Sequence, residues 1–183
     1  MHNDLKPKKD SELKPKDIRQ KLYRARSKGQ NFIFNGVPYY TVKNYKEHIP
    51  SAELKSKTHR KGQKRVDQMI PELEKEYPNP PYLILVNPVA GRGADIVVMK
   101  KEPFTILPYE PYHAFELTNE GKYSYIPDKD MKRYVESLRK FKCKRTLVVS
   151  YQSNLWNKKR KLHYSGALAK NKISVEVKGE IPL

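Results

Sequence analysis

The sequence predicts an α/β domain, a central mixed β-sheet flanked by helices, that follows a basic N-terminal extension. Short apolar runs rich in β-branched and aromatic residues recur between residues 82 and 151, as is typical of buried strands. Residues 131–141 instead carry apolar side chains at helical spacing. Several strands followed by a helix and another strand indicate a mixed sheet with helices packed against its faces.

The positive charge is concentrated in the N-terminal third. The 183 residues include 38 Lys/Arg and 20 Asp/Glu, a formal net charge of +18, and 18 of these cations with only six of the acids lie within residues 1–65. Such a density is typical of nucleic-acid-binding proteins, because each neutralised phosphate releases counterions. A solvated basic surface or a ribosome-associated protein is the alternative.

The sequence contains no run of the ~18 to 20 apolar residues that a membrane span requires, and residues 1–20 lack the apolar core of a signal peptide. The single cysteine, Cys143, excludes an intrachain disulfide and a zinc site built from several thiolates. We therefore expect an intracellular, cytoplasmic and nucleoid-associated protein that does not enter a membrane.

Residues 1–57 are expected to form the extension. Residues 1–16 repeat the phrase Leu-Lys-Pro-Lys and are predicted to be disordered, and residues 17–27 can form a short basic helix. Asn35-Gly36 then separates two apolar segments, and this dipeptide favours the positive φ angles of a tight hairpin turn. The hairpin folds either onto the core or onto DNA.

Residues 58–183 are expected to form the α/β domain. Its first helix can be capped by Thr58, and Pro71 would kink it or start a second helical piece. A second helix begins at Asp128, and the Lys-Lys-Arg-Lys run at 158–161 is expected to be a loop. The strands are predicted at 82–86, 95–99, 112–118, 145–151 and 173–177.

Two acidic residues stand at the edges of apolar strands. Asp95 precedes the run Ile-Val-Val-Met, and Glu116 follows Ala-Phe. If these strands pair, the two carboxylates can converge on Mg²⁺ or Mn²⁺, which prefer oxygen ligands. The alternative is that Asp95 caps a turn and Glu116 faces solvent.

The two acids belong to a series of short motifs that follow one another in a specific order along the chain. Arg60-Lys61-Gly62 opens a helix, Gly91 to Asp95 is a glycine-containing loop that ends in an acid, and Phe115 to Thr118 carries the second acid. Residues 125–141 and the strand at 146–149 complete the order. In this arrangement the sequence resembles the archaeal Holliday junction resolvases, members of the PD-(D/E)XK, restriction-endonuclease-like nucleases.

The resemblance implies the fold of that family and a divalent-metal phosphodiesterase. Asp95, Glu116 and the backbone carbonyl of Leu117 would hold the ion, and a metal-bound water would attack a phosphate. The family pattern also places a glutamate on the first helix, where this sequence has Val66. Asp67 is the preferred substitute ligand, and an exposed acid on a basic helix is the alternative.

A lysine is expected two residues after the glutamate, and Thr118 stands there. A threonine hydroxyl carries no positive charge, so either another cation takes its place in catalysis or cleavage is lost. Lys64 or Arg65 on the first helix is the expected replacement. His113, next to the site strand, is interpreted as a structural hydrogen-bonding residue.

The leading hypothesis is a metal-dependent, structure-selective endonuclease that acts on branched or duplex DNA. Symmetric cleavage of a four-way junction needs two active sites, so the resemblance implies a homodimer. The residues expected to contact nucleic acid are Arg60, Lys61, Arg65, Arg92, Lys158, Lys159, Arg160 and Lys161.

Two other hypotheses remain. The first is a catalytically degenerate protein of the resolvase fold that acts as a nucleic-acid-binding or nucleoprotein-assembly factor, which Thr118 favours. The second is an RNA-binding ribosomal or virion protein whose resemblance is accidental, and it predicts neither metal dependence nor a preference for junctions.

Overall fold

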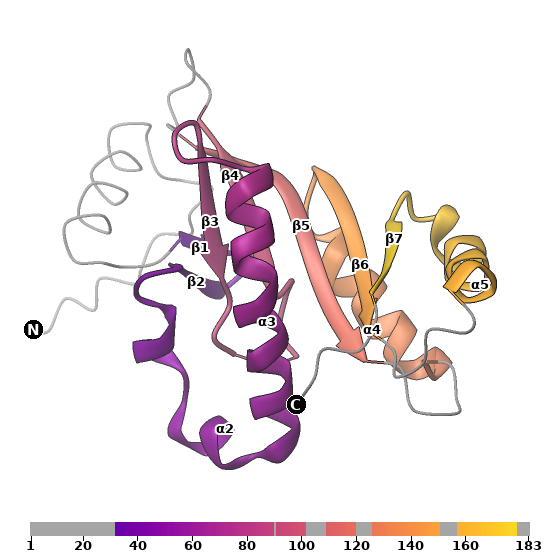
Figure 1. The fold of residues 1–183 in the computed structure, drawn as a ribbon, viewed down its shortest axis with the longest axis horizontal. Helices are drawn as coiled ribbons and strands as arrows, with labels where there is room; N and C mark the ends of the chain where they lie inside the picture. The colour runs from indigo at the N-terminus through magenta and orange to yellow at the C-terminus, as the bar shows by residue number, and fades with distance from the viewer. Residues whose placement is uncertain (1–31, 90, 102–108, 120–125, 151–156, 179–183) are drawn as a thin grey trace, which may run out of the picture.

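A computed structural model of the chain describes residues 32–89, 91–101, 109–119, 126–150 and 157–178, and within them seven strands form one sheet in the order β1 to β7 (Figure 1). The strands are β1 (Phe32–Phe34), β2 (Val37–Thr41), β3 (Tyr82–Val86), β4 (Ile96–Lys100), β5 (Glu110–Asn119), β6 (Lys144–Ser150) and β7 (Ser174–Lys178). The helices are the 3₁₀ helix η2 (Tyr45–His48) and the α-helices α2 (Ser51–Lys55), α3 (Lys57–Glu76), α4 (Asp128–Arg139) and α5 (Asn157–Ala169).

The sheet is mixed, as the sequence predicts. Neighbouring strands from β1 to β5 pair antiparallel, and β5, β6 and β7 pair parallel. Parallel neighbours need a crossover connection. Helix α4 makes this connection between β5 and β6, and α5 makes it between β6 and β7.

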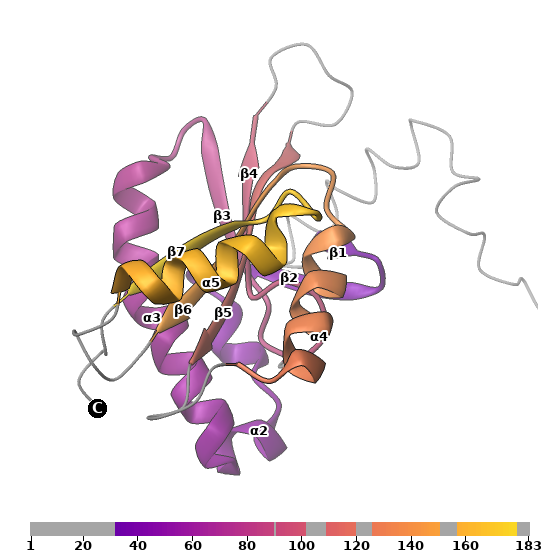
Figure 2. The ribbon, with the colours of Figure 1, turned by 90° about the vertical axis from the view of Figure 1, so that its right-hand side faces the viewer.

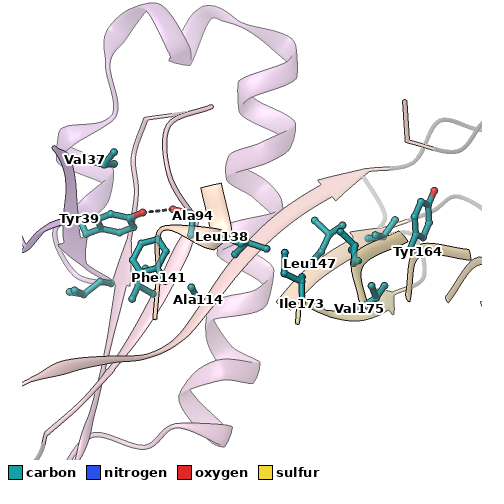
Figure 3. Packing of buried hydrophobic residues seen from close by; sticks show 14 of the residues in the cluster. Val37, Tyr39, Ala94, Ala114, Leu138, Phe141, Leu147, Tyr164, Ile173 and Val175 are labelled. Carbon is teal, nitrogen blue, oxygen red and sulfur yellow. Dashed lines mark hydrogen bonds between the residues drawn. The ribbon is translucent and has the colours of Figure 1, made fainter. Parts of the chain in front are cut away.

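The helices cover both faces of the sheet, and each face has its own core (Figure 2). Helix α3 packs Val66, Met69, Ile70 and Leu73 against one face. Helices α4 and α5 cover the other face. Their buried side chains include Leu138, Tyr164 and Leu168, which belong to one cluster with Leu85, Val97, Ala114 and Leu147 of the strands. Figure 3 shows part of this cluster, including Leu138, Tyr164, Ala114 and Leu147. Because successive strand residues point to opposite faces, the central strands contribute to both cores.

The predicted hairpin turn at Asn35-Gly36 is confirmed, with φ angles of 50° and 77°. The predicted boundary between residues 57 and 58 does not separate two structural units, however. Strand β2 pairs with β3, and Val37 and Tyr39 of β2 are buried in the core beneath α4. The hairpin therefore belongs to the α/β domain.

Helix α3 differs from its prediction at the N-cap, and at Pro71 it does not start a second helical piece. Ser56 is its N-cap, and the Ser56 hydroxyl accepts a hydrogen bond from the backbone N–H of His59 at 3.4 Å. Pro71 lies inside the helix, which continues to Glu76. Leu73 beyond the proline is buried against the sheet, and this burial offsets the hydrogen bond that a proline cannot donate.

The run at 158–161 is not a loop, because its backbone belongs to α5. Tyr164 and Leu168 lie four residues apart and are both buried, so helical spacing places them together against the sheet. Expectations for residues 1–27 lie outside the described residues. No helix among the described residues combines the length and the apolar character needed to cross a membrane.

Candidate functional site

The register of the sheet brings the two acids together. Strands β4 and β5 are antiparallel, and Ile96 is opposite Phe115. Asp95 directly precedes Ile96, and the backbone N–H of Asp95 donates to the carbonyl of Phe115 at 2.9 Å. Asp95 therefore lies beside the segment of β5 that carries Glu116, and both acids line the same pocket.

Asp95 is held in place by the backbone around it. Its Oδ2 accepts a hydrogen bond from the N–H of Leu117 at 2.7 Å. The preceding loop is closed by Asn87, whose backbone N–H donates to the carbonyl of Asp95 at 2.9 Å. The Asn87 side chain also accepts from the N–H of Val89 at 2.9 Å and donates to the carbonyl of Arg92.

A second support for this loop comes from the N-terminal hairpin. The hydroxyl of Tyr39, a fully buried residue of β2, donates to the carbonyl of Ala94 at 2.9 Å (Figure 3). Gly93 has a φ of +74°, and a Cβ at Gly93 would lie 2.7 Å from the Tyr39 hydroxyl. The loop can approach the tyrosine this closely only because residue 93 has no side chain.

The sequence analysis did not identify this role of Tyr39. Tyr39 and Ala94 are separated by 55 residues, and no local pattern indicates that β2 lies beside β3. The only signal in the sequence was the glycine-containing turn itself, which marks a place where other atoms approach the backbone closely.

The acids line a pocket of about 340 Å³ at the edge of the sheet. It is formed by the N-terminal half of α3, the loop before β4, the end of β5 and the second turn of α4. The residues that line it are Thr58, His59, Gly62, Gln63, Arg65, Val66, Asn87, Pro88, Gly91, Asp95, Glu116, Leu117, Arg133 and Tyr134.

Glu116 is buried and Asp95 is half-buried, and burial disfavours the charged form of a carboxyl group. Burial raises the pKa of Asp95 to about 6, although the Leu117 N–H and the charges of Arg65 and Arg133 oppose this shift. Burial and the neighbouring Asp95 raise the pKa of Glu116 well above its ordinary value. Oε2 of Glu116 has no hydrogen-bond partner among the described residues.

Two arginines supply positive charge to the pocket. The Arg65 guanidinium, from α3, is largely buried, and burial lowers its pKa. Arg133, from α4, is about half exposed and donates to the hydroxyl of Tyr134 at 3.2 Å. Arg65 was a candidate from the sequence, whereas Arg133 was not, because nothing in the pattern of α4 indicated which of its exposed residues would face β5.

The position at which the resemblance expects a lysine is neutral. The Thr118 hydroxyl donates to the Tyr134 hydroxyl at 2.9 Å and so connects β5 to α4. Thr118 itself is buried. Any positive charge that acts here must therefore come from another element.

The structure does not bring Lys64 and Asp67 to the acid pair. They line a separate hollow of about 150 Å³, together with Ile49, Leu54 and Arg60 among others. Asp67 accepts a hydrogen bond from the Tyr45 hydroxyl and lies 3.2 Å from Nζ of Lys46. Residues 64 and 67 lie on a different side of α3 from Arg65, because successive helical residues are about 100° apart.

The remaining predicted residues are distributed around the pocket and beyond it. Arg60 and Arg92 are exposed and Lys61 is half-buried. Lys158, Lys159, Arg160 and Lys161 belong to the first turns of α5. His113 is structural, as expected: its ring nitrogens lie 2.7 Å from the Tyr77 hydroxyl and 2.8 Å from the Thr146 hydroxyl, and burial lowers its pKa to about 3.

The donor set fits a hard divalent cation in part. Asp95 and Glu116 offer carboxylate oxygens, one of them buried without a partner, and magnesium sites commonly combine one or two carboxylates with water. The described residues contain no cluster of three or more His, Cys, Asp or Glu side chains able to hold a metal. An ion here would have two carboxylate ligands, without Asp67.

Comparison of the chain with protein-family models, with curated proteins and with solved structures finds no match. Any functional conclusion must therefore be drawn from the pocket and its chemistry.

Proposed function

We propose that the protein is a metal-dependent DNA endonuclease of the resolvase type, with its active site in the pocket around Asp95 and Glu116. One observation carries this proposal: the carboxyl groups of Asp95 and the buried Glu116 line one pocket, and Oε2 of Glu116 has no hydrogen-bond partner among the described residues. Burying such groups destabilises the fold, so a cation that satisfies them is the simplest explanation of their placement.

Each side chain of the pocket has a defined task in this reaction. Asp95 and Glu116 would hold Mg²⁺ or Mn²⁺, which would supply an activated water and neutralise charge on the phosphoryl oxygens. The hydrogen bonds from Leu117 to Asp95 and from Tyr39 to Ala94 fix the first carboxylate before the ion binds. Arg65 and Arg133 carry the positive charge that Thr118 cannot supply.

The substrate we propose is branched or duplex DNA, bound through its phosphates. Exposed cations stand at Arg92, next to Gly91 of the pocket lining, and at Arg60, which lines the separate hollow on α3, and the whole chain has a net charge of +18. Contacts to phosphate position a protein on DNA without reading its sequence. We further propose a homodimer, because two active sites are needed to cut both strands of a junction symmetrically.

A second candidate function is favoured by one observation. The Thr118 hydroxyl donates to the Tyr134 hydroxyl, and the described residues that line the pocket include no lysine that could orient or deprotonate water. Arginine does not release its proton in proteins and so cannot act as a general base. On this reading the protein binds DNA through the same surface without cutting it.

The two functions are separated by one experiment. Purified protein is incubated with end-labelled four-way junction, linear duplex and single-stranded DNA, in Mg²⁺, in Mn²⁺ and in EDTA. We expect nicking of the junction that requires metal and that falls by about 100-fold or more in Glu116→Gln. Glu136→Gln, at an exposed position of α4, is the matched control and should cut normally.

Tight binding of the junction with no cleavage in either metal would favour the binding-only function. Cleavage that persists in EDTA or in Glu116→Gln would show that the acid pair is not the active site.

A further inference from the structure

The pocket contains two positive and two negative side chains from four different segments. Arg65 comes from α3 and Arg133 from α4, while Asp95 precedes β4 and Glu116 lies on β5. All four side chains line the same pocket, and Arg133 also pairs with Asp130 at 3.5 Å. Taken with full formal charges, the two arginines and the two acids sum to zero.

The guanidinium of Arg65 is not fully satisfied in this arrangement. Its Nε is buried and has no hydrogen-bond partner among the described residues. An arginine stays protonated in proteins, so this buried donor also carries charge. A buried donor without an acceptor is unfavourable, and a charged one more so. An anionic ligand in the pocket would supply the acceptor that the described residues do not.

We propose that Arg65 and Arg133 form a phosphodiester-binding clamp that becomes available when a divalent cation occupies Asp95 and Glu116. This inference rests on the metal site of the proposed function. In the metal-free protein the two acids share the pocket with the two guanidinium groups, and Asp130 is a further acidic partner of Arg133. A cation bound by the two acids adds two positive charges to the pocket, which favours a phosphodiester anion.

The clamp also accounts for the neutral residue at position 118. A phosphoryl oxygen in the pocket would meet positive charge from α3 on one side of the sheet and from α4 on the other. Guanidinium groups bind phosphate oxygens through charge-assisted hydrogen bonds. A cation on β5 is then unnecessary for binding the phosphate.

Because the four groups share one pocket, the cation and the phosphodiester should bind cooperatively, and the coupling must be reciprocal. Removing Arg65 should then have opposite effects on the two ligands. The cation loses a repulsive neighbour and binds more tightly, whereas the phosphodiester loses a donor and binds more weakly. A residue that merely supported the fold would weaken both.

The test is a pair of NMR titrations on the full chain. Mg²⁺ is titrated alone, and the dinucleotide thymidylyl-thymidine, a phosphodiester monoanion, is titrated with and without saturating Mg²⁺. In Arg65→Gln we expect Mg²⁺ affinity to rise several-fold and dinucleotide affinity in Mg²⁺ to fall about tenfold. Arg139→Gln removes an exposed arginine outside the pocket, at the end of the same helix as Arg133, and should change neither affinity.

Arg133→Gln provides a second variant. The Arg133 side chain is half-exposed, so its substitution should perturb the fold less than that of Arg65. It should shift both affinities in the same directions as Arg65→Gln, by smaller factors. If both affinities fall together in the two variants, or neither changes, the clamp is excluded.

The same titrations distinguish failure of the clamp from failure of the proposed function. If the wild-type protein binds no Mg²⁺, or if Glu116→Gln binds it equally well, the metal site is wrong and the clamp fails with it. Another outcome is that Glu116→Gln abolishes Mg²⁺ binding while the arginine variants fail to shift the Mg²⁺ and dinucleotide affinities in opposite directions. In that case the metal site stands and only the clamp is overturned.

Discussion

Asp95 makes the stability of the metal-free protein depend on pH. Its side chain is half-buried, and burial raises the pKa of its carboxyl group to about 6, above an ordinary value of 3.8. The folded protein therefore holds the proton on this group more tightly than the unfolded chain does. The contribution of this group to stability is fully present below about pH 4 and is lost as the pH rises through about 6.

We predict that Asp95→Asn stabilises the metal-free protein at pH 7 but not at pH 4. A shift of about two pKa units corresponds to at most about 3 kcal/mol, and the asparagine oxygen can still accept from the N–H of Leu117. Urea unfolding in EDTA, at intervals from pH 4 to 7, measures the difference. Glu136→Gln, an exposed control, should follow the wild type. An Asp95→Asn protein with the wild-type pH dependence would contradict the burial of this charge.

Gly93 and Gly91 have similar backbone conformations but different surroundings. Both have positive φ angles, of 74° and 75°, but only at Gly93 does another atom, the Tyr39 hydroxyl, occupy the space of a Cβ. Alanine at either position therefore has the same backbone strain, and only at residue 93 does it also displace the tyrosine.

We predict that Gly91→Ala lowers the free energy of unfolding by about 1 kcal/mol and Gly93→Ala by at least about 2 kcal/mol. Thermal or chemical denaturation of both variants measures the two values. Gly93→Ala should be partly rescued by Tyr39→Phe, which removes the clashing oxygen. Equal losses in the two glycine variants would show that the contact with Tyr39 does not constrain the loop.

At the scale of elements, the hairpin β1–β2 contributes more to the domain than its place near the N-terminus indicates. Strand β2 covers the edge of β3 and places Val37 and Tyr39 in the core. The following 3₁₀ helix η2 buries Tyr45 against the opposite face. This segment therefore stabilises both cores and, through Tyr39, the loop that carries Asp95.

We predict that a chain beginning at residue 32 folds cooperatively, whereas a chain beginning at residue 58 does not. The longer deletion removes three buried side chains worth about 1.5–3 kcal/mol each, and their sum is comparable to the total stability of a typical domain. Near-ultraviolet circular dichroism and urea unfolding of the two truncated proteins provide the measurement. A cooperatively folded 58–183 fragment would restore the boundary that the sequence suggested.

At the scale of the whole molecule, the charge is divided between two parts of the chain. Residues 1–31 contain ten Lys/Arg and four Asp/Glu. Residues 32–183, the sheet domain, carry the rest of the excess positive charge. If residues 1–31 contact phosphates, their removal reduces the number of counterions that DNA releases on binding.

We predict that deletion of residues 1–31 makes the plot of log affinity for duplex DNA against log salt less steep. The slope should change by about 0.9 for each phosphate contact that is lost. Fluorescence anisotropy between low and physiological salt measures it for the full and shortened chains. An unchanged slope would mean that these residues do not touch phosphate and that the sheet domain alone binds the backbone.

The sequence by itself determined the local features of this protein. The apolar runs located β3 to β6 to within a few residues, Asn35-Gly36 specified the hairpin turn, and the spacing of apolar residues predicted α4. The placement of Asp95 and Glu116 at the edges of apolar runs made their convergence one of two alternatives, conditional on the pairing of their strands. These features depend on periodicity and turn preference, which act over a few residues.

Only the tertiary structure decided which segments lie side by side. It placed β2 beside β3, brought Tyr39 to the loop before Asp95, and turned Arg65 rather than Lys64 towards the acids. It also directed Asp67 to Tyr45 and continued α5 through residues 158–161. These outcomes depend on the order of strands and on which side of each helix is buried. Long-range packing fixes both, and no pattern within a short window of sequence records them.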